Sequence, residues 1–124
     1  MNNINELFDY TKERLNAAGL IEVSINADYP SFEVPERSTY KQDEGILRQQ
    51  VFGYDIRLSK VYKHNAAGEN VSVRLYVEKW NKSCGTTVIK VKYSYKDSVK
   101  KINRLIDEVV NTYKKVINEK TGEV

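Results

Sequence analysis

The sequence contains a single cysteine, Cys84, and a single histidine, His64. One cysteine cannot form an internal disulfide, and such sparse use fits a reducing compartment. One cysteine and one histidine also cannot supply the ligands of a structural zinc site. No glycine-rich phosphate-binding motif is present. We therefore expect neither a metal nor a cofactor.

The chain also lacks a long apolar run. No stretch approaches the roughly 20 apolar residues that a membrane helix needs. The first residues, MNNINELFDY, contain no basic region followed by an apolar segment, which a secretory signal would require. We therefore expect a cytoplasmic protein that has no contact with a membrane.

Charge of one sign is not in large excess, because the formal net charge is +3. The chain has 124 residues, of which 40% are hydrophobic and 30% are charged. These values are typical of one globular domain spanning residues 1–124. A mildly basic balance does not identify the class of partner, so the distribution of charges must do so.

Residues 3–19 have the pattern of a helix. Asn3 can cap it, Glu6 stands in a capping-box position, and Gly19 can end it. Residues 20–27 then alternate with a period of two, with Ile21 and Val23 expected on the buried side of a strand.

Residues 28–51 form a long insertion with two prolines. One interpretation is a loop that contains only a short turn or an extra strand near residues 46–50, ILRQQ. The other is a partner-binding loop, because long loops often carry function. The sequence favours neither.

Three alternating segments follow, over residues 52–59, 71–80 and 89–95. The short connections between them favour antiparallel hairpins. A last helix begins near Asp97 and Ser98 and has apolar residues at spacings of three and four. The sequence predicts an α+β fold, in which the N- and C-terminal helices cover one face of an antiparallel sheet of about four strands.

The uncovered face of this sheet is the first candidate binding surface. Cations interleaved with aromatic side chains suit phosphate backbones and stacked bases, and they also suit an acidic protein surface. The alternative is an ordinary solvated face, with Trp80 tucked under the long loop. The candidate residues are Arg57, Lys63, Arg74, Tyr76, Trp80, Lys90 and Lys92.

The start of the last helix is the second candidate surface. It carries cations where the helix dipole favours acids, at a cost of about 0.3–1 kcal/mol per residue. Packing of the apolar stripe can override that cost. If the cations are functional, they form an anion site, most simply for phosphate. The residues are Lys96, Lys100, Lys101 and Arg104.

The geometry of the predicted strands excludes the catalytic arrangements that the sequence could offer. His64 and Cys84 fall at opposite ends of one predicted strand, about 30 Å apart at roughly 3.3 Å per residue. Glu78 and Lys79 are adjacent, so they point to opposite faces and cannot form the acid and lysine pair of a metal nuclease. Asp55 and Glu78 are interpreted as part of an ion-pair lattice. We therefore expect no catalytic residues and no enzyme.

Two segments carry a resemblance, GYDIRLSK at 53–60 and TTVIKVKYSYKDSVKKINRLIDEVV at 86–110. Over about half of its length the chain resembles small phage-encoded anti-CRISPR proteins that inhibit type II CRISPR nucleases broadly. The resemblance implies a protein of a mobile element that binds a host nuclease or its guide RNA. It does not locate the binding residues.

The leading hypothesis is a non-enzymatic phage or mobile-element protein that inhibits a host CRISPR nuclease or ribonucleoprotein by stoichiometric binding. One alternative is direct binding of RNA or DNA, because the predicted architecture is similar to the double-stranded RNA-binding domain. Another alternative is a structural or assembly protein that dimerises through its sheet.

Overall fold

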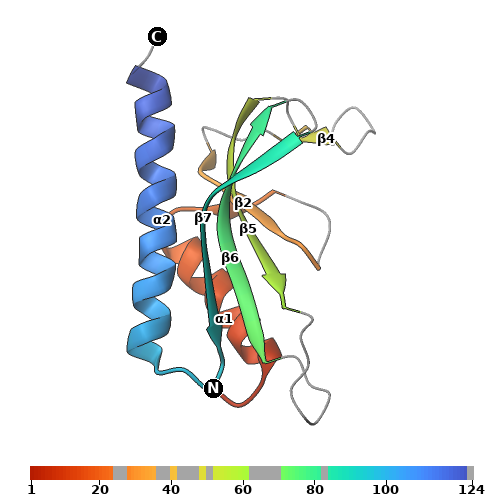
Figure 1. Cartoon of the computed structure of the whole chain (residues 1–124), viewed down its shortest axis with the longest axis vertical. Coiled ribbons are helices and arrows are strands. Elements are labelled where there is room, and N and C mark those ends of the chain that lie inside the picture. Colours follow the sequence, from red (N-terminus) through yellow and green to blue (C-terminus); the bar gives the residue numbers. More distant parts are fainter. Residues whose placement is uncertain are drawn as a thin grey trace.

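The structure is a computed structural model that describes residues 1–23, 28–35, 40–41, 48–49, 52–61, 71–81 and 84–122. It has an α+β fold, with two helices and a five-stranded antiparallel sheet (Figure 1). A separate two-stranded antiparallel sheet joins β3 to β4. The elements are α1 (Ile4–Ala17), β1 (Ile21–Glu22), β2 (Ser31–Glu33), β3 (Tyr40–Lys41), β4 (Arg48–Gln49), β5 (Phe52–Lys60), β6 (Ser72–Asn81), β7 (Cys84–Ser94) and α2 (Val99–Gly122).

Helix α1 begins and ends at the predicted residues. The side chain of Asn3 accepts a hydrogen bond of 2.9 Å from the backbone N–H of Glu6, which confirms the predicted cap. Gly19 has a φ of 92°, in the left-handed region that favours glycine. The N–H of Leu20 then donates to the carbonyl of Leu15 at 3.1 Å, as in a Schellman motif. This turn aims the chain back toward the sheet.

The main sheet has the order β1-β2-β5-β6-β7. The prediction of about four strands is wrong by one, because the main sheet contains five. The unexpected strand is β2, which lies inside the 28–51 segment and pairs with both β1 and β5. β2 has only three residues, and all three are buried. Such a short, fully buried strand has no alternation for sequence reasoning to detect.

The strand after α1 follows the predicted phase only in part, because Val23 is buried as predicted but Ile21 is not. Ile21 is 41% exposed, whereas Leu20 belongs to the hydrophobic core. Glu22 faces α1, where its carboxylate pairs with Lys12 at 3.2 Å. The two residues of β1 are too few for apolar alternation to fix the phase. Residues 24–27 of the predicted strand lie outside the described part of the chain.

Both helices cover the same face of the main sheet, hereafter the inner face. α2 contacts β5, β6 and β7, and α1 contacts α2, β6 and β1 (Figure 1). Between the helices and the sheet lies one core of apolar side chains. It includes Leu7, Phe8 and Leu15 from α1, Ile56, Leu58, Val73, Leu75, Val77, Val91 and Tyr93 from the sheet, and Ile102, Ile106, Val109 and Tyr113 from α2.

Two tyrosines fix helices to strands through buried hydroxyls. Thr11 donates to the carbonyl of Leu7 at 2.9 Å, and its oxygen lies 2.8 Å from the hydroxyl of Tyr93. The backbone N–H of Val34, directly after β2, donates to the hydroxyl of Tyr113 at 3.0 Å. These bonds fix the positions of β7 and β2 relative to the helices. Neither helix within the described ranges combines the length and apolar character needed to cross a membrane.

Candidate binding surface on the outer face of the sheet

The face opposite the helices, the outer face, brings several predicted residues together. Arg57 pairs with Tyr76, and Tyr76 pairs with Lys90. Two residues further along the strands, and so on the same face, Arg74 pairs with Lys92. Because paired residues in antiparallel strands point to the same face, these side chains form one surface.

The outer face is exposed over β6 and β7 but covered over much of β2 and β5 in the described part of the chain. Toward β2 and β5, the side chains of Ser31, Glu33, Asp55 and Ser59 are all buried. Asp55, interpreted from the sequence as part of an ion-pair lattice, is thus completely buried rather than exposed on this face. Alternation reports which face a side chain points to, but not what covers that face.

Trp80 lies at the centre of a group of contacts that we name the Trp80 cluster: Asp55, Arg57, Glu78, Trp80 and Gly85. The indole Nε1 donates to Oδ1 of Asp55 at 3.1 Å. The guanidinium of Arg57 stacks 4.7 Å from the centroid of the indole ring. Arg57 Nε also lies 3.5 Å from Oδ2 of Asp55, the separation of an ion pair rather than of a short hydrogen bond. Trp80 and Arg57 are thus partners of each other, and both are only partly exposed.

Burial raises the pKa of Asp55 from 3.8 to about 6. Arg57 and the indole hydrogen bond act against this rise, and the facing carboxylate of Glu78 adds to it. Burial also raises the pKa of Tyr76, although Arg57 opposes that shift. Arg57 thus partly compensates the burial of both groups.

Gly85 makes room for the indole. It pairs with Trp80 across β6 and β7. A Cβ atom at residue 85 would lie 3.2 Å from Cη2 of Trp80 and 3.1 Å from Oε2 of Glu78. On its other side, Trp80 pairs with Gly53. Glycines facing a tryptophan from both neighbouring strands leave room for its large side chain.

Among the residues that the structure describes, three cations remain available on the outer face, and we name them the cationic strip: Arg74, Lys90 and Lys92. Lys90 and Lys92 are exposed and Arg74 is partly exposed. Within the described ranges, no carboxylate lies within ion-pair distance of these three side chains. Arg57, in contrast, is engaged in the Trp80 cluster. The strip is therefore narrower than the predicted surface.

The cations at the start of α2 form a separate group. Lys100, Lys101 and Arg104 are exposed, whereas Ile102 of the same helix is fully buried against the sheet. By helical periodicity they lie on the side of α2 away from the sheet, and so across the sheet from the cationic strip. The structure does not unite the two candidate surfaces.

This second group also has internal partners. Lys101 pairs with Asp97 at 3.2 Å, and Lys96 lies 5.9 Å from the centroid of the Tyr95 ring. Ser98 caps the helix by accepting a bond of 3.2 Å from the N–H of Lys101. Lys96, Lys100 and Arg104 are left as its exposed cations without a carboxylate partner in the described residues.

Two residues considered in the sequence analysis have no described position. Lys63, a predicted binding residue, and His64 both lie outside the described residues. Cys84 is exposed at the first position of β7. The described residues contain no group of three or more His, Cys, Asp or Glu side chains that would hold a metal ion.

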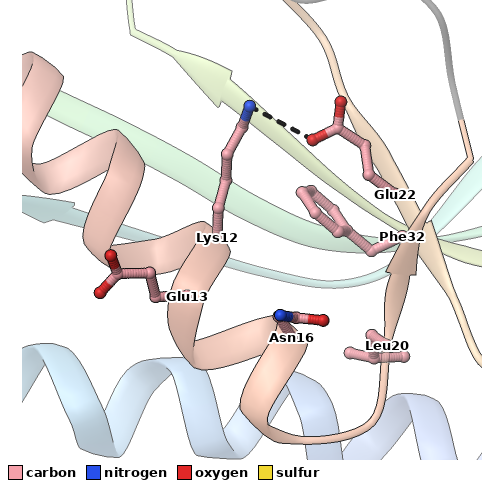
Figure 2. Close-up of a pocket in the computed structure, with 6 residues that line it drawn as sticks. All are labelled: Lys12, Glu13, Asn16, Leu20, Glu22 and Phe32. Carbon is pink, nitrogen blue, oxygen red and sulfur yellow. Dashed lines mark ion pairs between the residues drawn. The ribbon is translucent and has the colours of Figure 1, made fainter.

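A depression between α1 and the β1–β2 pair is a different feature, on the inner side of the sheet (Figure 2). Its volume is about 260 Å³, below the roughly 300–1,000 Å³ of most small-molecule sites. The ion pair of Lys12 and Glu22 spans it, above Leu20 and Phe32. We interpret the depression as a packing gap between α1 and the edge of the sheet.

The sequence did not predict the Trp80 cluster, although it singled out Asp55, Arg57, Glu78 and Trp80 separately. The available signal was the pair of glycines, which stand opposite Trp80 only in the correct strand register. That register includes a bulge between Val77 and Glu78. An irregularity of this kind cannot be read from alternation.

Comparisons with known proteins add no relative. The chain matches no protein-family model, and neither the curated proteins nor the solved structures contain a match.

Proposed function

We propose that this chain is a non-enzymatic binding protein of a phage or other mobile element, which inhibits a host CRISPR nuclease or ribonucleoprotein by stoichiometric binding in the host cytoplasm. Its partner presents a negative surface, either guide RNA or an acidic patch of the nuclease, and the cationic strip receives it. A basic inhibitor suits these targets, because electrostatic complementarity steers association and selects the partner.

The observation that carries the proposal is the pairing of Arg74 with Lys92 on an exposed surface. Like charges directly opposite each other destabilise a strand pair. A bound anion would offset that repulsion, whereas water and salt only screen it. The resemblance of residues 53–60 and 86–110 to anti-CRISPR proteins supports the choice of partner.

The test is inhibition of DNA cleavage by a panel of type II CRISPR nucleases, each loaded with guide RNA, together with comigration on a native gel. We expect inhibition to saturate at a stoichiometric ratio. The double variant Arg74→Glu, Lys92→Glu should lose inhibition and comigration. The control Lys100→Glu, Arg104→Glu has the same change in net charge on the other side of the molecule and should keep both. Equal effects of the two variants would refute a role for the strip.

A second candidate function is direct binding of duplex RNA through the start of α2. It is favoured by Lys100 and Arg104 near the helix N-terminus, which are exposed and have no carboxylate partner within the described ranges. In this case, affinity for a duplex should fall steeply with salt and should be lost in Lys100→Glu, Lys101→Glu. The Arg74→Glu, Lys92→Glu variant should then bind the duplex nearly as well as the unmodified chain.

A further inference from the structure

β7 lies at the edge of the main sheet. Among the described residues, only β6 pairs with it (Figure 1). The strand is eleven residues long. A long edge strand presents a row of backbone donors and acceptors on which another chain can add a strand.

The ladder decides which backbone groups face this free edge. The N–H of Tyr95 donates to the carbonyl of Val71 at 3.2 Å, and the register of β6 and β7 continues from this pair. In an antiparallel ladder, hydrogen-bonded pairs alternate with pairs whose N–H and C=O point away from each other. The backbone groups of Ser94, Lys92 and Lys90 therefore point away from β6.

Two further bonds support this assignment. The N–H of Ser94 donates to Oδ2 of Asp97 at 2.8 Å, on the side away from β6. The carbonyl of Ser72, which pairs with Ser94, accepts from the N–H of Val61 at 2.9 Å and so points toward β5. Asp97 thus caps the last outward residue of the edge. Within the described residues, no such partner meets the outward groups of Lys90 and Lys92.

The side chains along this edge define the partner. Lys90 and Lys92 are exposed on the outer face, while Ile89 is half-buried and Val91 is buried on the inner face. A strand added here would place acidic side chains beside the lysines and apolar side chains beside Ile89. A second copy of this chain fits poorly, because β7 paired with itself would bring the lysines of the two copies together.

We propose that the edge of β7 binds an extended polypeptide segment in which acidic and apolar residues alternate, added antiparallel as a sixth strand of the main sheet. This inference rests on the proposed function, because it identifies the part of a protein partner that the cationic strip receives.

The test uses a fluorescein-labelled peptide, Thr-Glu-Val-Glu-Val-Glu-Thr, and fluorescence anisotropy with the full chain. In the proposed register the N–H groups of the glutamates face β7, and those of the valines face away. N-methylation of the three glutamates should weaken binding by roughly tenfold or more, because it removes edge hydrogen bonds. N-methylation of the two valines is the matched control and should have little effect.

A pair of protein variants tests the same edge. Lys90→Pro and Lys90→Ala remove the same charge, but only proline also removes the outward N–H, which edge strands tolerate. We expect Lys90→Pro to bind the peptide roughly fivefold more weakly than Lys90→Ala, the effect of about one hydrogen bond. Circular dichroism checks that both variants are folded. If Lys90→Pro is unfolded, the comparison of the N-methylated peptides on the unmodified chain still tests the inference.

Three outcomes would overturn the inference. If all peptides bind equally, the contact is a charge contact without strand addition, and the proposed function stands. If the peptide does not bind but an RNA duplex binds in a way that depends on Lys90 and Lys92, the strip serves nucleic acid instead. If peptide, RNA duplex and polyglutamate all fail to bind, the proposed function fails as well.

Discussion

The indole N–H of Trp80 donates to a carboxylate, that of Asp55, which is completely buried. Burial raises the pKa of Asp55 to about 6 in the folded chain, against 3.8 for an unperturbed aspartate. The folded state therefore binds this proton more tightly than the unfolded state does. The stability associated with the protonated form is complete below about pH 4 and is lost as the pH rises through about 6.

The variant Asp55→Asn is predicted to remove this dependence, since asparagine stays neutral and keeps an acceptor for the indole. Relative to Asp55→Asn, the unmodified chain should lose about 3 kcal/mol of unfolding free energy between pH 4 and pH 7. Urea unfolding at half-unit pH intervals measures the difference. If the same difference is found in a His64→Gln background, the histidine is not its source. Parallel pH profiles of unfolding free energy for the unmodified chain and Asp55→Asn would contradict the assignment to Asp55.

Gly85→Ala is predicted to displace Trp80. The new Cβ would lie 3.2 Å from Cη2 of the indole, which Asp55 and Arg57 hold in place. We expect a loss of about 1–3 kcal/mol in unfolding free energy from overpacking, and a red shift in the emission of the single tryptophan.

Gly19→Ala is the matched control for this prediction. Gly19 has a φ of 92° and no heavy atom within 4 Å of an added Cβ. This variant should lose about 1–2 kcal/mol through backbone strain and leave the emission unchanged. An unshifted emission spectrum in Gly85→Ala would show that the indole does not lie against residue 85.

Thr11 and Tyr93 are predicted to be energetically coupled. Because the Thr11 hydroxyl donates its hydrogen to Leu7, the Tyr93 hydroxyl must be the donor in their shared bond. Thr11→Val leaves that donor buried without its acceptor and should cost about 1–3 kcal/mol. Tyr93→Phe should cost only about 0.5–1.5 kcal/mol. In a double-mutant cycle by urea unfolding, the double variant should lose less than the sum of the two single losses; strict additivity would mean that the bond contributes nothing.

Tyr113→Phe is predicted to loosen the end of β2. The N–H of Val34 would lose its acceptor, so its amide hydrogen exchange should accelerate. The amide of Val23, which donates to the carbonyl of Ser31 at 2.8 Å on the other side of β2, is the internal control. Faster amide exchange at Val34 but not at Val23 would indicate that the Tyr113 hydroxyl bond acts locally. Unchanged exchange at Val34 would count against that bond.

Sequence reasoning was most successful where one period ran over many residues. The 24 residues of α2 and the long strands β5 and β6 have such periods, and they lie close to the predicted ranges. β7 also alternates, but it begins at Cys84, before the predicted start at residue 89. β2, with three buried residues between Pro30 and Pro35, had no period to read. Of the two residues predicted on the buried side of the strand after α1, Val23 is buried but Ile21 is exposed, and Leu20 enters the core instead.

The sequence predicted which face of the sheet carries the candidate site, but not which of its side chains contact each other. Alternation placed Arg74, Lys90 and Lys92 on one surface, and the strand register does so too. It could not indicate that Arg57 stacks on Trp80, because that contact joins side chains that are not directly opposite each other in the β5 and β6 register. Long-range pairing of this kind is decided by tertiary packing.

The bond between Val34 and Tyr113 joins residues 79 positions apart. During synthesis on the ribosome, β2 emerges long before the helix that supplies this hydroxyl. In the nascent chain, α1 and the early strands therefore cannot complete the core until α2 has left the exit tunnel. Until then their apolar surface is exposed to chaperones.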